Sequence, residues 1–473
     1  MLTSKMNLAS ISKKVFIGPP RIDMLTLFVL LVFWGTNVNA QISSHDTLFL
    51  SFNLTQTNSH VHTPGNNTEP QKEDGLFLTE ILQRTNISGD WWGARNTFNE
   101  SGIDVELIYK GEMFSNLSGG LKKATTTLDN IDLIFLADLE KGFGLGNTNL
   151  KIQFLGNSGG VPCDFVGAGQ GISNIETIPT WKLYQALLEK KFFGERLSIA
   201  TGLYDLNSEF DCRETSSIFI NPSHGIGPEI AQSGLNGPSI FPTTSAALRM
   251  KYEFGNGNYF QTAILDGVPG DPENPYNTHI IFNKEDGLLL TAEAGYVINK
   301  DEQLLTKIAF GMWTYTSKFG KNNFSDNNEN SISLEKNYGF YLSAEKLLVS
   351  NFENPNKNIS GFLRIGYANK NINPVDFYLG GGFKFTGLLG WQEDNALGIA
   401  FALAHNSLAF RNSSSILNAI DIKSYELNFE ATYLLPLTPW LMLQPDIQYI
   451  VNPSYCSQSA NAFVVGSRMQ LVF

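Results

Sequence analysis

Charged and polar side chains stand at alternate positions in many stretches of this sequence, and the positions between them are largely apolar. Glu106, Lys110 and Glu112, for example, share one parity, whereas Val105 and Leu107 have the other. Successive side chains of a β-strand point to opposite faces, so the charged groups would share one face of a strand. There they could bind a polar solute or simply form a wall in contact with water. The candidates of this kind are Glu106, Lys110, Glu112, Asp132, Lys182, Tyr184, Arg249, Lys251, Arg364, Glu426, Asp446 and Arg468.

Residue types that carry out catalysis or hold metal ions are sparse. The chain has six histidines and contains neither G-x-S-x-G nor H-E-x-x-H, so the sequence indicates no catalytic set. His60 and His62 alone are too few for a metal site. We therefore expect no enzyme, no metal site and no cofactor. The net charge of −12 also makes nucleic acid a poor partner.

The alternation predicts sixteen β-strands, and these strands would position the candidate residues. The last of them, 462–473, is mostly apolar at its odd positions and ends on an aromatic residue. An even number of strands brings both chain ends to the same side, as a single-chain barrel requires. The predicted strands are 103–114, 130–139, 149–156, 181–190, 196–206, 245–254, 259–266, 287–298, 305–316, 337–347, 358–368, 376–386, 395–405, 423–434, 441–450 and 462–473.

Composition and loop lengths favour a membrane barrel over a soluble sandwich. Only 16% of the residues are charged and 42% are hydrophobic, which is too polar for a bundle of membrane helices yet low in charge for a soluble protein. The predicted connections are short after the even-numbered strands and often long after the others, like the two rims of an outer-membrane barrel. We therefore expect an all-β, 16-stranded antiparallel transmembrane β-barrel with short periplasmic turns and long extracellular loops.

The N-terminal part of the chain is expected to direct export. An apolar run at 24–34 follows several basic residues and precedes a small-residue cleavage site at 38–40. This order is typical of a signal peptide. We predict a signal peptide at 1–40, a flexible leader with room for a short helix at 41–84, and the β-barrel at 85–473.

Several sequence motifs within the predicted barrel occur together in one family. They are Gly89-Asp-Trp-Trp-Gly-Ala-Arg95, Phe114-Ser-Asn-Leu-Ser-Gly-Gly120, Ser216-Ser-Ile-Phe-Ile-Asn221, Leu443-Gln-Pro-Asp-Ile-Gln-Tyr449 and the terminal Phe473. Together they resemble the carbohydrate-selective porin family (OprB-like) over residues 85–473. The resemblance implies a Gram-negative outer-membrane barrel for passive diffusion of sugars. Trp92 departs from the family, which usually has glycine at this position.

In such a porin the lumen selects the solute. Charged and amide side chains suit sugar hydroxyls, and aromatic rings suit the C–H faces of the sugar. The longest predicted loop, 207–244, carries Glu209, Asp211 and Arg213 near its start. We predict that this loop folds into the lumen and constricts it, with loop 157–180 beside it. The alternatives are a porin of other or broad small-solute specificity, an outer-membrane barrel enzyme, or an adhesin.

Cys163 and Cys212 fall in these two loops, and Cys456 is the third cysteine. Export places them where a disulfide can persist. We predict a bond between Cys163 and Cys212, and the alternative is that both are free thiols. The bond requires Cα atoms within about 7 Å of each other.

The two ends of the predicted barrel suggest roles outside the lumen. Phe473 is expected to be read by the outer-membrane barrel assembly machinery, and the outer face to contact outer-membrane lipid. In the Gly89–Arg95 motif, either Arg95 pairs with an acid in the lumen or the tryptophan pair anchors the chain at the membrane interface. A monomer and a homotrimer both stay open.

Overall fold

The computed structural model describes residues 82, 84–300, 303–320, 334–351, 354, 356–387, 394–418, 422–453 and 459–473. The expected signal peptide and nearly all of the expected leader lie outside these residues, and so do His60, His62 and Cys456. The predictions made for those segments are therefore not addressed by the structure.

Sixteen antiparallel strands form a closed barrel in the described part of the chain, which confirms the predicted fold. Most strand boundaries agree with the prediction within a few residues. The largest difference lies in the first hairpin, where Ser115 and Asn116 pair with Thr125 and Ala124 beyond the end of the apolar pattern. The strands are β1 (Ile103–Gly120), β2 (Ala124–Asp138), β3 (Thr148–Gly159), β4 (Thr180–Phe192), β5 (Leu197–Tyr204), β6 (Ser245–Glu253), β7 (Asn258–Asp266), β8 (Leu288–Lys300), β9 (Gln303–Gly320), β10 (Leu334–Ser350), β11 (Asn358–Ala368), β12 (Val375–Thr386), β13 (Ala396–Asn406), β14 (Tyr425–Thr438), β15 (Leu441–Val451) and β16 (Ala460–Val472).

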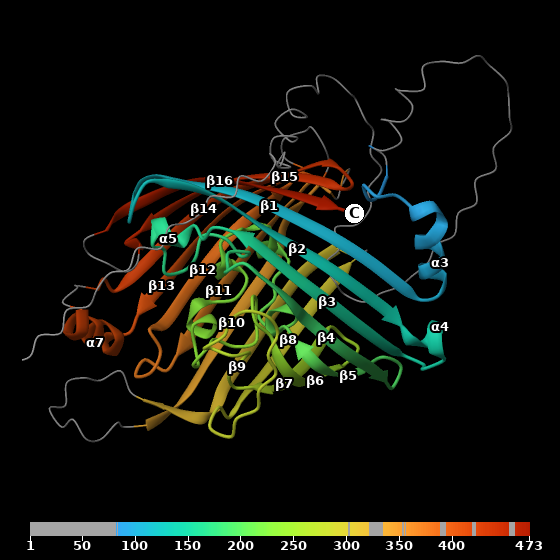
Figure 1. Ribbon diagram of the computed structural model, residues 1–473, viewed down its shortest axis with the longest axis horizontal. Coiled ribbons are helices and arrows are strands. Elements are labelled where there is room, and N and C mark those ends of the chain that lie inside the picture. Colours follow the sequence, from blue (N-terminus) through green and yellow to red (C-terminus); the bar gives the residue numbers. More distant parts are fainter. Residues whose placement is uncertain are drawn as a thin grey trace, which may run out of the picture. The chain divides into compact units, whose positions relative to one another are not determined.

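The barrel closes between its first and last strands. β1 pairs with β16 along a register that runs from Ile108 opposite Val472 to Gly120 opposite Ala460. All other strands pair with their neighbours in the sequence, so the sheet has no open edge. Figure 1 shows β1 lying beside the red strand β16.

The two faces of the barrel wall differ in the way that the alternation predicted. On β10, the side chains of Tyr338, Phe340 and Leu342 are 45–46% exposed, whereas Tyr341 and Ser343 are buried. Exposed apolar side chains on the outer face suit lipid, and the polar side chains of the other parity point into the barrel. The charged candidates on the strands therefore belong to the lumen side of the wall.

Short helices lie in the segments outside the strands. None of the described helices is long and apolar enough to span a membrane. The connections after β4 and β6 are tight turns at 193–196 and 254–257, whereas the connections after β3 and β5 are long. The helices are η1 (Trp91–Gly93), α3 (Ala94–Glu100), α4 (Leu139–Phe143), α5 (Cys163–Val166), η2 (Leu206–Ser208), η3 (Thr215–Ile218), η4 (Pro222–His224), α6 (Pro228–Ala231) and α7 (Leu408–Asn418).

The segment before β1 contacts the C-terminus of the chain. Arg95 Nη2 donates a hydrogen bond to the main-chain oxygen of Phe473 at 2.9 Å, and its guanidinium carbon lies 4.4 Å from the ring centre of Trp91. Ile87 N–H donates to the carbonyl of Val472. The hydrogen-bond partner of Arg95 is thus the chain terminus rather than an acid in the lumen, and the expected role of the tryptophan pair at the membrane interface stays a prediction.

Trp92 is fully exposed and has a left-handed backbone with φ of 57°. A residue without a Cβ adopts that conformation at little cost, so the glycine that the resemblance implies at this position would fit the backbone. The departure of this chain from the family pattern therefore falls at a position where a side chain is disfavoured by the backbone.

Candidate functional site

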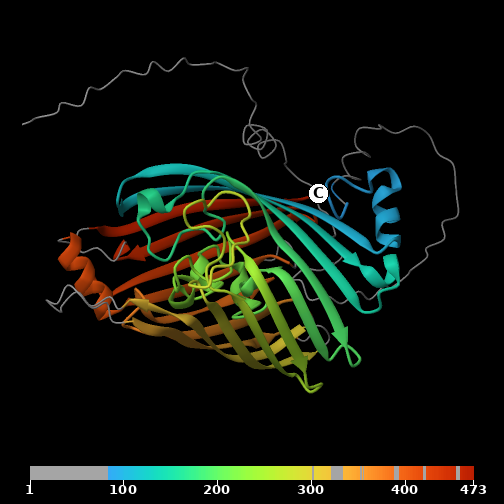
Figure 2. The ribbon, with the colours of Figure 1, turned by 60° about the horizontal axis from the view of Figure 1, so that its bottom comes forward.

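Two long connections fold back into the barrel. Residues 205–244 between β5 and β6, which we call the constriction loop, contain η2, η3, η4 and α6. Residues 160–179 between β3 and β4, the inner loop, contain α5. Both contact inward-facing side chains of distant strands, and Figure 2 shows the green constriction loop among those strands. This is the arrangement that we predicted for the two loops.

Arg364 on β11 holds the constriction loop through two carboxylates. Its Nη2 atom lies 2.5 Å from Oε1 of Glu229, and its Nε atom lies 2.9 Å from Oδ2 of Asp211. Arg213, on the loop itself, lies 2.5 Å from Oδ1 of Asp211. All four side chains are at most 1% exposed. Two cations and two anions thus balance one another where water is excluded.

These ion pairs keep Asp211 charged although it is buried. Burial would raise the pKa of Asp211, but Arg364 and Arg213 outweigh this effect and hold the pKa below its ordinary value. The ring centres of Tyr341 and Tyr378 lie 5.4 and 5.1 Å from the guanidinium carbon of Arg364, a distance at which a cation is attracted to a ring. The network therefore fixes the first half of the loop against β10, β11 and β12.

Four carboxylates on the three strands β8, β10 and β14 accept hydrogen bonds from the loop backbones. A loop inside a barrel has many backbone N–H groups that must find partners once water is removed, and an anionic acceptor serves them well. The bonds to the constriction loop are Asp211 N–H to Glu293 (2.9 Å), Thr215 N–H to Glu345 (2.7 Å) and Ile220 N–H to Glu430 (2.6 Å). Those to the inner loop are Gly169 N–H (2.8 Å) and Gln170 N–H (2.9 Å), both to Glu426.

The inner loop also contacts the seam between β1 and β16. Ser173 Oγ lies 2.6 Å from Oε2 of Glu112, and Arg468 Nη2 lies 2.5 Å from Oδ1 of Asn174. Arg468 and Glu112 form an ion pair across the seam at 2.5 Å. Together the two loops therefore occupy the part of the lumen next to β8, β10, β11, β14, β16 and the adjoining edge of β1.

The wall formed by β1, β2 and β3 carries polar side chains that bond to one another. Lys110 Nζ lies 3.3 Å from Oδ2 of Asp132, and Gln153 Nε2 lies 2.9 Å from Oδ1 of the same carboxylate. The Lys110 side chain is 25% exposed and that of Asp132 is 9% exposed. We call these three residues the wall row. Lys110 presents its ammonium group on the lumen surface, whereas the Asp132 carboxylate and the Gln153 amide are nearly buried beside it.

A second polar group lies where the constriction loop leaves β5. Arg249 on β6 lies 2.8 Å from both Glu189 on β4 and Glu209 on the loop. It also donates to Ser198 Oγ. The Glu209 and Glu189 side chains are 27% and 12% exposed, so this cluster also has carboxylate groups in contact with solvent. The lumen therefore offers hydrogen-bonding groups of both charges.

Residues 122–473 match the family described as carbohydrate-selective porin, OprB family. The chain belongs to that family. It is similar to Porin B of Pseudomonas aeruginosa, with 26% identity over 423 residues that cover 81% of this chain and 90% of the other. It is also similar to the putative porin QuiX of Acinetobacter baylyi, with 20% identity over 82% of this chain and 93% of the other. The high-pH structure of Pseudomonas putida OprB, 21% identical, superposes over 83% of this chain and 99% of the other with a TM-score of 0.73.

The family resemblance inferred from the motifs is thereby confirmed. As a member of the family the porin is an outer-membrane channel for carbohydrates in a Gram-negative bacterium. The likeness to the solved porin structures supports the same barrel. Among the described residues, no group of three or more His, Cys, Asp or Glu side chains is arranged to hold a metal ion.

The sequence-derived candidates fall into two structural groups in the porin. One group is buried beneath the loops or in contact with them, and there the structure corrects the expectation that these side chains line an open pore. Their burial makes them anchors for the loops. This group comprises Glu112, Lys182, Tyr184, Asp211, Arg213, Arg364, Glu426 and Asp446, each at most 6% exposed. The others, Glu106, Lys110, Asp132, Glu209, Arg249, Lys251 and Arg468, either keep exposed surface or pair with a group that does.

The predicted disulfide between Cys163 and Cys212 is wrong, because both residues are free thiols. Cys163 Sγ lies 2.9 Å from Oε1 of Glu176 in the inner loop, and Cys212 Sγ lies 2.7 Å from the carbonyl of Asn207 in the constriction loop. Burial raises the pKa of both thiols, so both are protonated at neutral pH. Each cysteine stabilises its own loop by a local hydrogen bond.

Several functional residues were missed by the sequence reasoning. Gln153, Glu293 and Glu345 have the inward parity of their strands, so the alternation could have found them. Glu229 lies in the Gly- and Pro-rich part of the constriction loop, where no period exists to mark it. Its role depends on Arg364, which is 135 residues away in the sequence.

The docked constriction loop of the porin should become less stable in acid because of His224. This side chain is buried between Phe219 and Phe362, its Nε2 atom lies 3.6 Å from Oε2 of Glu430, and neither ring nitrogen has a hydrogen-bond partner among the described residues. Burial, and then Arg213, lower the pKa of His224 to about 3. A released loop would take up a proton near pH 6.5 that the docked loop excludes, so docking weakens as the pH falls below about 6.5, by about 1.4 kcal/mol per unit.

Single-channel recordings between pH 7 and pH 4 would measure this as more frequent openings to a larger conductance. His224→Phe keeps the aromatic packing and removes the proton site, so the acid-dependent openings should be reduced in that variant. Equal pH dependence in both proteins would show that His224 does not control the loop.

Proposed function

We propose that sugars cross this porin through an opening bordered by the wall row, Lys110, Asp132 and Gln153, on one side and the constriction loop on the other. The observation that carries the proposal is that the described loop anchors, which lie on β1, β4, β6, β8, β10, β11, β14, β15 and β16, do not include the three residues of the wall row. The wall row bonds within itself and keeps exposed surface at Lys110. Solute passing the constriction loop would therefore meet this wall.

The chemistry of the wall row suits a neutral polyhydroxylated solute. Each sugar hydroxyl can donate one hydrogen bond and accept others. Lys110 and the Gln153 amide supply donors, and the Asp132 carboxylate supplies acceptors. Because Lys110 and Asp132 neutralise each other at 3.3 Å, an ion of either charge gains less from this wall than from an unpaired charge. A neutral solute replaces its bound water by these groups without a net electrostatic cost.

The substrate can be tested by liposome swelling with the mature porin in its membrane. Glucose and other monosaccharides should enter faster than amino acids of similar size. The Asp132→Ala variant removes the acceptor shared by Lys110 and Gln153 and leaves Lys110 as an unpaired cation. We expect this change to lower the sugar-to-amino-acid ratio several-fold and to shift ion selectivity towards anions.

Lys251→Ala is the matched control for this experiment. Lys251 also points into the lumen, but it pairs with Glu253 at 2.9 Å, away from the wall row. Its removal should leave the ratio unchanged. The proposal fails if the Asp132 and Lys251 variants behave alike, or if the wild-type porin admits amino acids as fast as sugars.

We further propose that the chain acts only as a channel, without catalysis, and that it is exported by cleavage of a signal peptide at 1–40. Mass spectrometry of the mature protein should then find an N-terminus at Gln41. We also propose that the barrel assembly machinery binds Phe473 when it inserts the porin. The inserted porin is then a monomer or a homotrimer. Crosslinking in intact membranes would distinguish the two oligomeric states.

A further inference from the structure

A hollow of about 520 Å³ lies in the outer half of the wall formed by β10 to β14. The strand register explains its shape. Two neighbouring rows of outward-facing residues cross these strands, and each row contains small residues beside large ones. One row is Lys346, Gly361, Phe383 and Ile399, and the other is Ala344, Leu363, Gly381, Phe401 and Phe429.

Glycine makes the floor of this hollow. A Cβ at Gly361 would lie 3.0 Å from a methyl carbon of Leu348 and 3.3 Å from the ring of Phe383, and a Cβ at Gly381 would lie 3.1 Å from the carbonyl oxygen of Phe362. Glycine in the interior of a strand weakens it, and often marks a place where another molecule approaches the backbone closely. A Cβ at either position would crowd its neighbours, and glycine there keeps the floor of the hollow at the level of the backbone.

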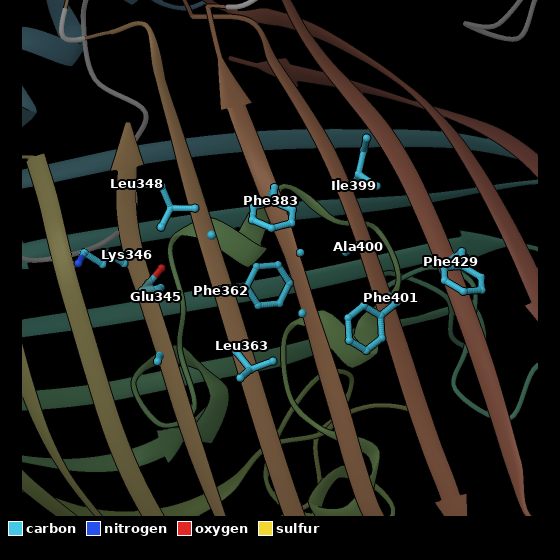
Figure 3. Close-up of a pocket in the computed structure, with 14 residues that line it drawn as sticks. Glu345, Lys346, Leu348, Phe362, Leu363, Phe383, Ile399, Ala400, Phe401 and Phe429 are labelled. Carbon is cyan, nitrogen blue, oxygen red and sulfur yellow. The ribbon is translucent and has the colours of Figure 1, made fainter. Parts of the chain in front are cut away.

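Apolar side chains surround the floor. Leu348, Leu363, Phe383, Ile399 and Phe429 are each 47–50% exposed and line the hollow together. Figure 3 shows Phe383 and Ile399 in one row across the strands and Leu363, Phe401 and Phe429 in the next. The outer face of the barrel contacts lipid, so the available occupant with a matching shape is a flexible hydrocarbon chain rather than water.

Lys346 supplies a charge at one end of the hollow. It is exposed, belongs to the outward parity of β10 and lies opposite Gly361. β10 ends at Ser350, four residues further on, at the end of the barrel that carries the short turns. A lysine on the lipid face near a membrane interface extends its ammonium group towards the headgroups and favours an anionic phosphate.

We propose that the hollow and Lys346 form a binding site for one anionic glycerophospholipid from the inner leaflet of the outer membrane. One acyl chain fills the space above Gly361 and Gly381, and the phosphate contacts the ammonium group of Lys346. A second copy of the barrel is a poorer occupant, because its outer wall is convex and presents bulky side chains, whereas the hollow is concave. One lipid would therefore stay bound to the outer wall of the porin at β10 to β14.

Native mass spectrometry of the full mature porin, titrated with dioleoylphosphatidylglycerol in detergent, tests this site. The wild-type protein should retain one lipid under activation that removes the others. Gly381→Leu fills the hollow and should reduce the retained fraction several-fold. Lys346→Gln leaves the hollow intact and should reduce retention of phosphatidylglycerol while sparing dioleoylglycerol, which has the same chains and no phosphate.

Two variants on other sectors of the outer face serve as controls. Ala294→Leu on β8 also places a leucine at an exposed position, and Lys318→Gln on β9 removes an exposed lysine near the opposite rim. Both should retain lipid like the wild type. Equal retention in all proteins overturns the proposal, and so does retained lipopolysaccharide in place of phospholipid. If Gly381→Leu dissociates an oligomer and does not reduce lipid retention, the hollow is a contact between two copies of the porin. That result would also overturn the proposal.

Discussion

Replacing Arg364 by alanine should release the constriction loop and produce channels of several-fold higher and noisier conductance. Arg364 is the guanidinium that binds both Asp211 and Glu229, and all three groups are at most 1% exposed. The substitution leaves two carboxylates in a buried site with only Arg213 to offset them. Breaking a buried ion pair on one side costs about 3–5 kcal/mol, so the docked position of the loop should no longer be favoured.

Single-channel recordings in planar bilayers measure this effect directly. Arg196→Ala is the matched control, because Arg196 is an exposed arginine in the turn between β4 and β5. A second variant, Arg364→Ala combined with Asp211→Asn and Glu229→Gln, removes the uncompensated charges and should restore part of the low conductance. Wild-type conductance in Arg364→Ala would mean that the backbone bonds to Glu293, Glu345 and Glu430 hold the loop without the ion pairs.

Deleting Phe473 should reduce the amount of porin inserted into the outer membrane far more than it changes the channels that do form. Phe473 N–H donates to Leu107, which completes the last rung between β1 and β16, and its main-chain oxygen accepts from Arg95. The deletion therefore removes both the expected assembly signal and the hydrogen bond from Arg95 in the segment before β1. Membrane fractionation and conductance of the inserted protein give the two quantities.

Arg95→Ala separates these two roles. It removes the charge-assisted hydrogen bond and the ring contact with Trp91, which together stabilise the folded barrel by about 2–4 kcal/mol. We expect lower heat stability on semi-native gels with nearly normal insertion. Phe473→Tyr keeps an aromatic terminus and should insert normally. If Arg95→Ala and the deletion lose insertion equally, the terminal residue acts through this contact rather than as a signal.

The strands could be predicted from the sequence because their signal is local. A strand in a barrel wall has lipid on one side and a wet lumen on the other, so every second residue has the same environment. The alternation of Val105, Leu107 and Tyr109 with Glu106 and Lys110 is enough to assign both strand and face. The same reasoning found Arg364 and Glu426, which do point inwards.

The partners of those inward residues could not be predicted from the alternation. Arg364 and Asp211 are 153 residues apart, and Glu426 and Gln170 are 256 residues apart. The two-residue alternation shows on which face of the strand a side chain lies. It does not show whether water or a folded loop covers that face. The irregular loop sequence has no period, so the pairing of each loop with a strand depends on the closed barrel.

The sequence alone therefore determined the barrel, the number of its strands, the family and the inward position of the charged residues. Tertiary structure decided which charges anchor the loops, which keep exposed surface and that Cys163 and Cys212 stay apart. It also decided that Gly361, Gly381 and Lys346 meet on the outer wall. The physical reason is that alternation reports the environment of one strand, whereas contacts between loops, strands and lipid arise only after the first and last strands have closed the sheet.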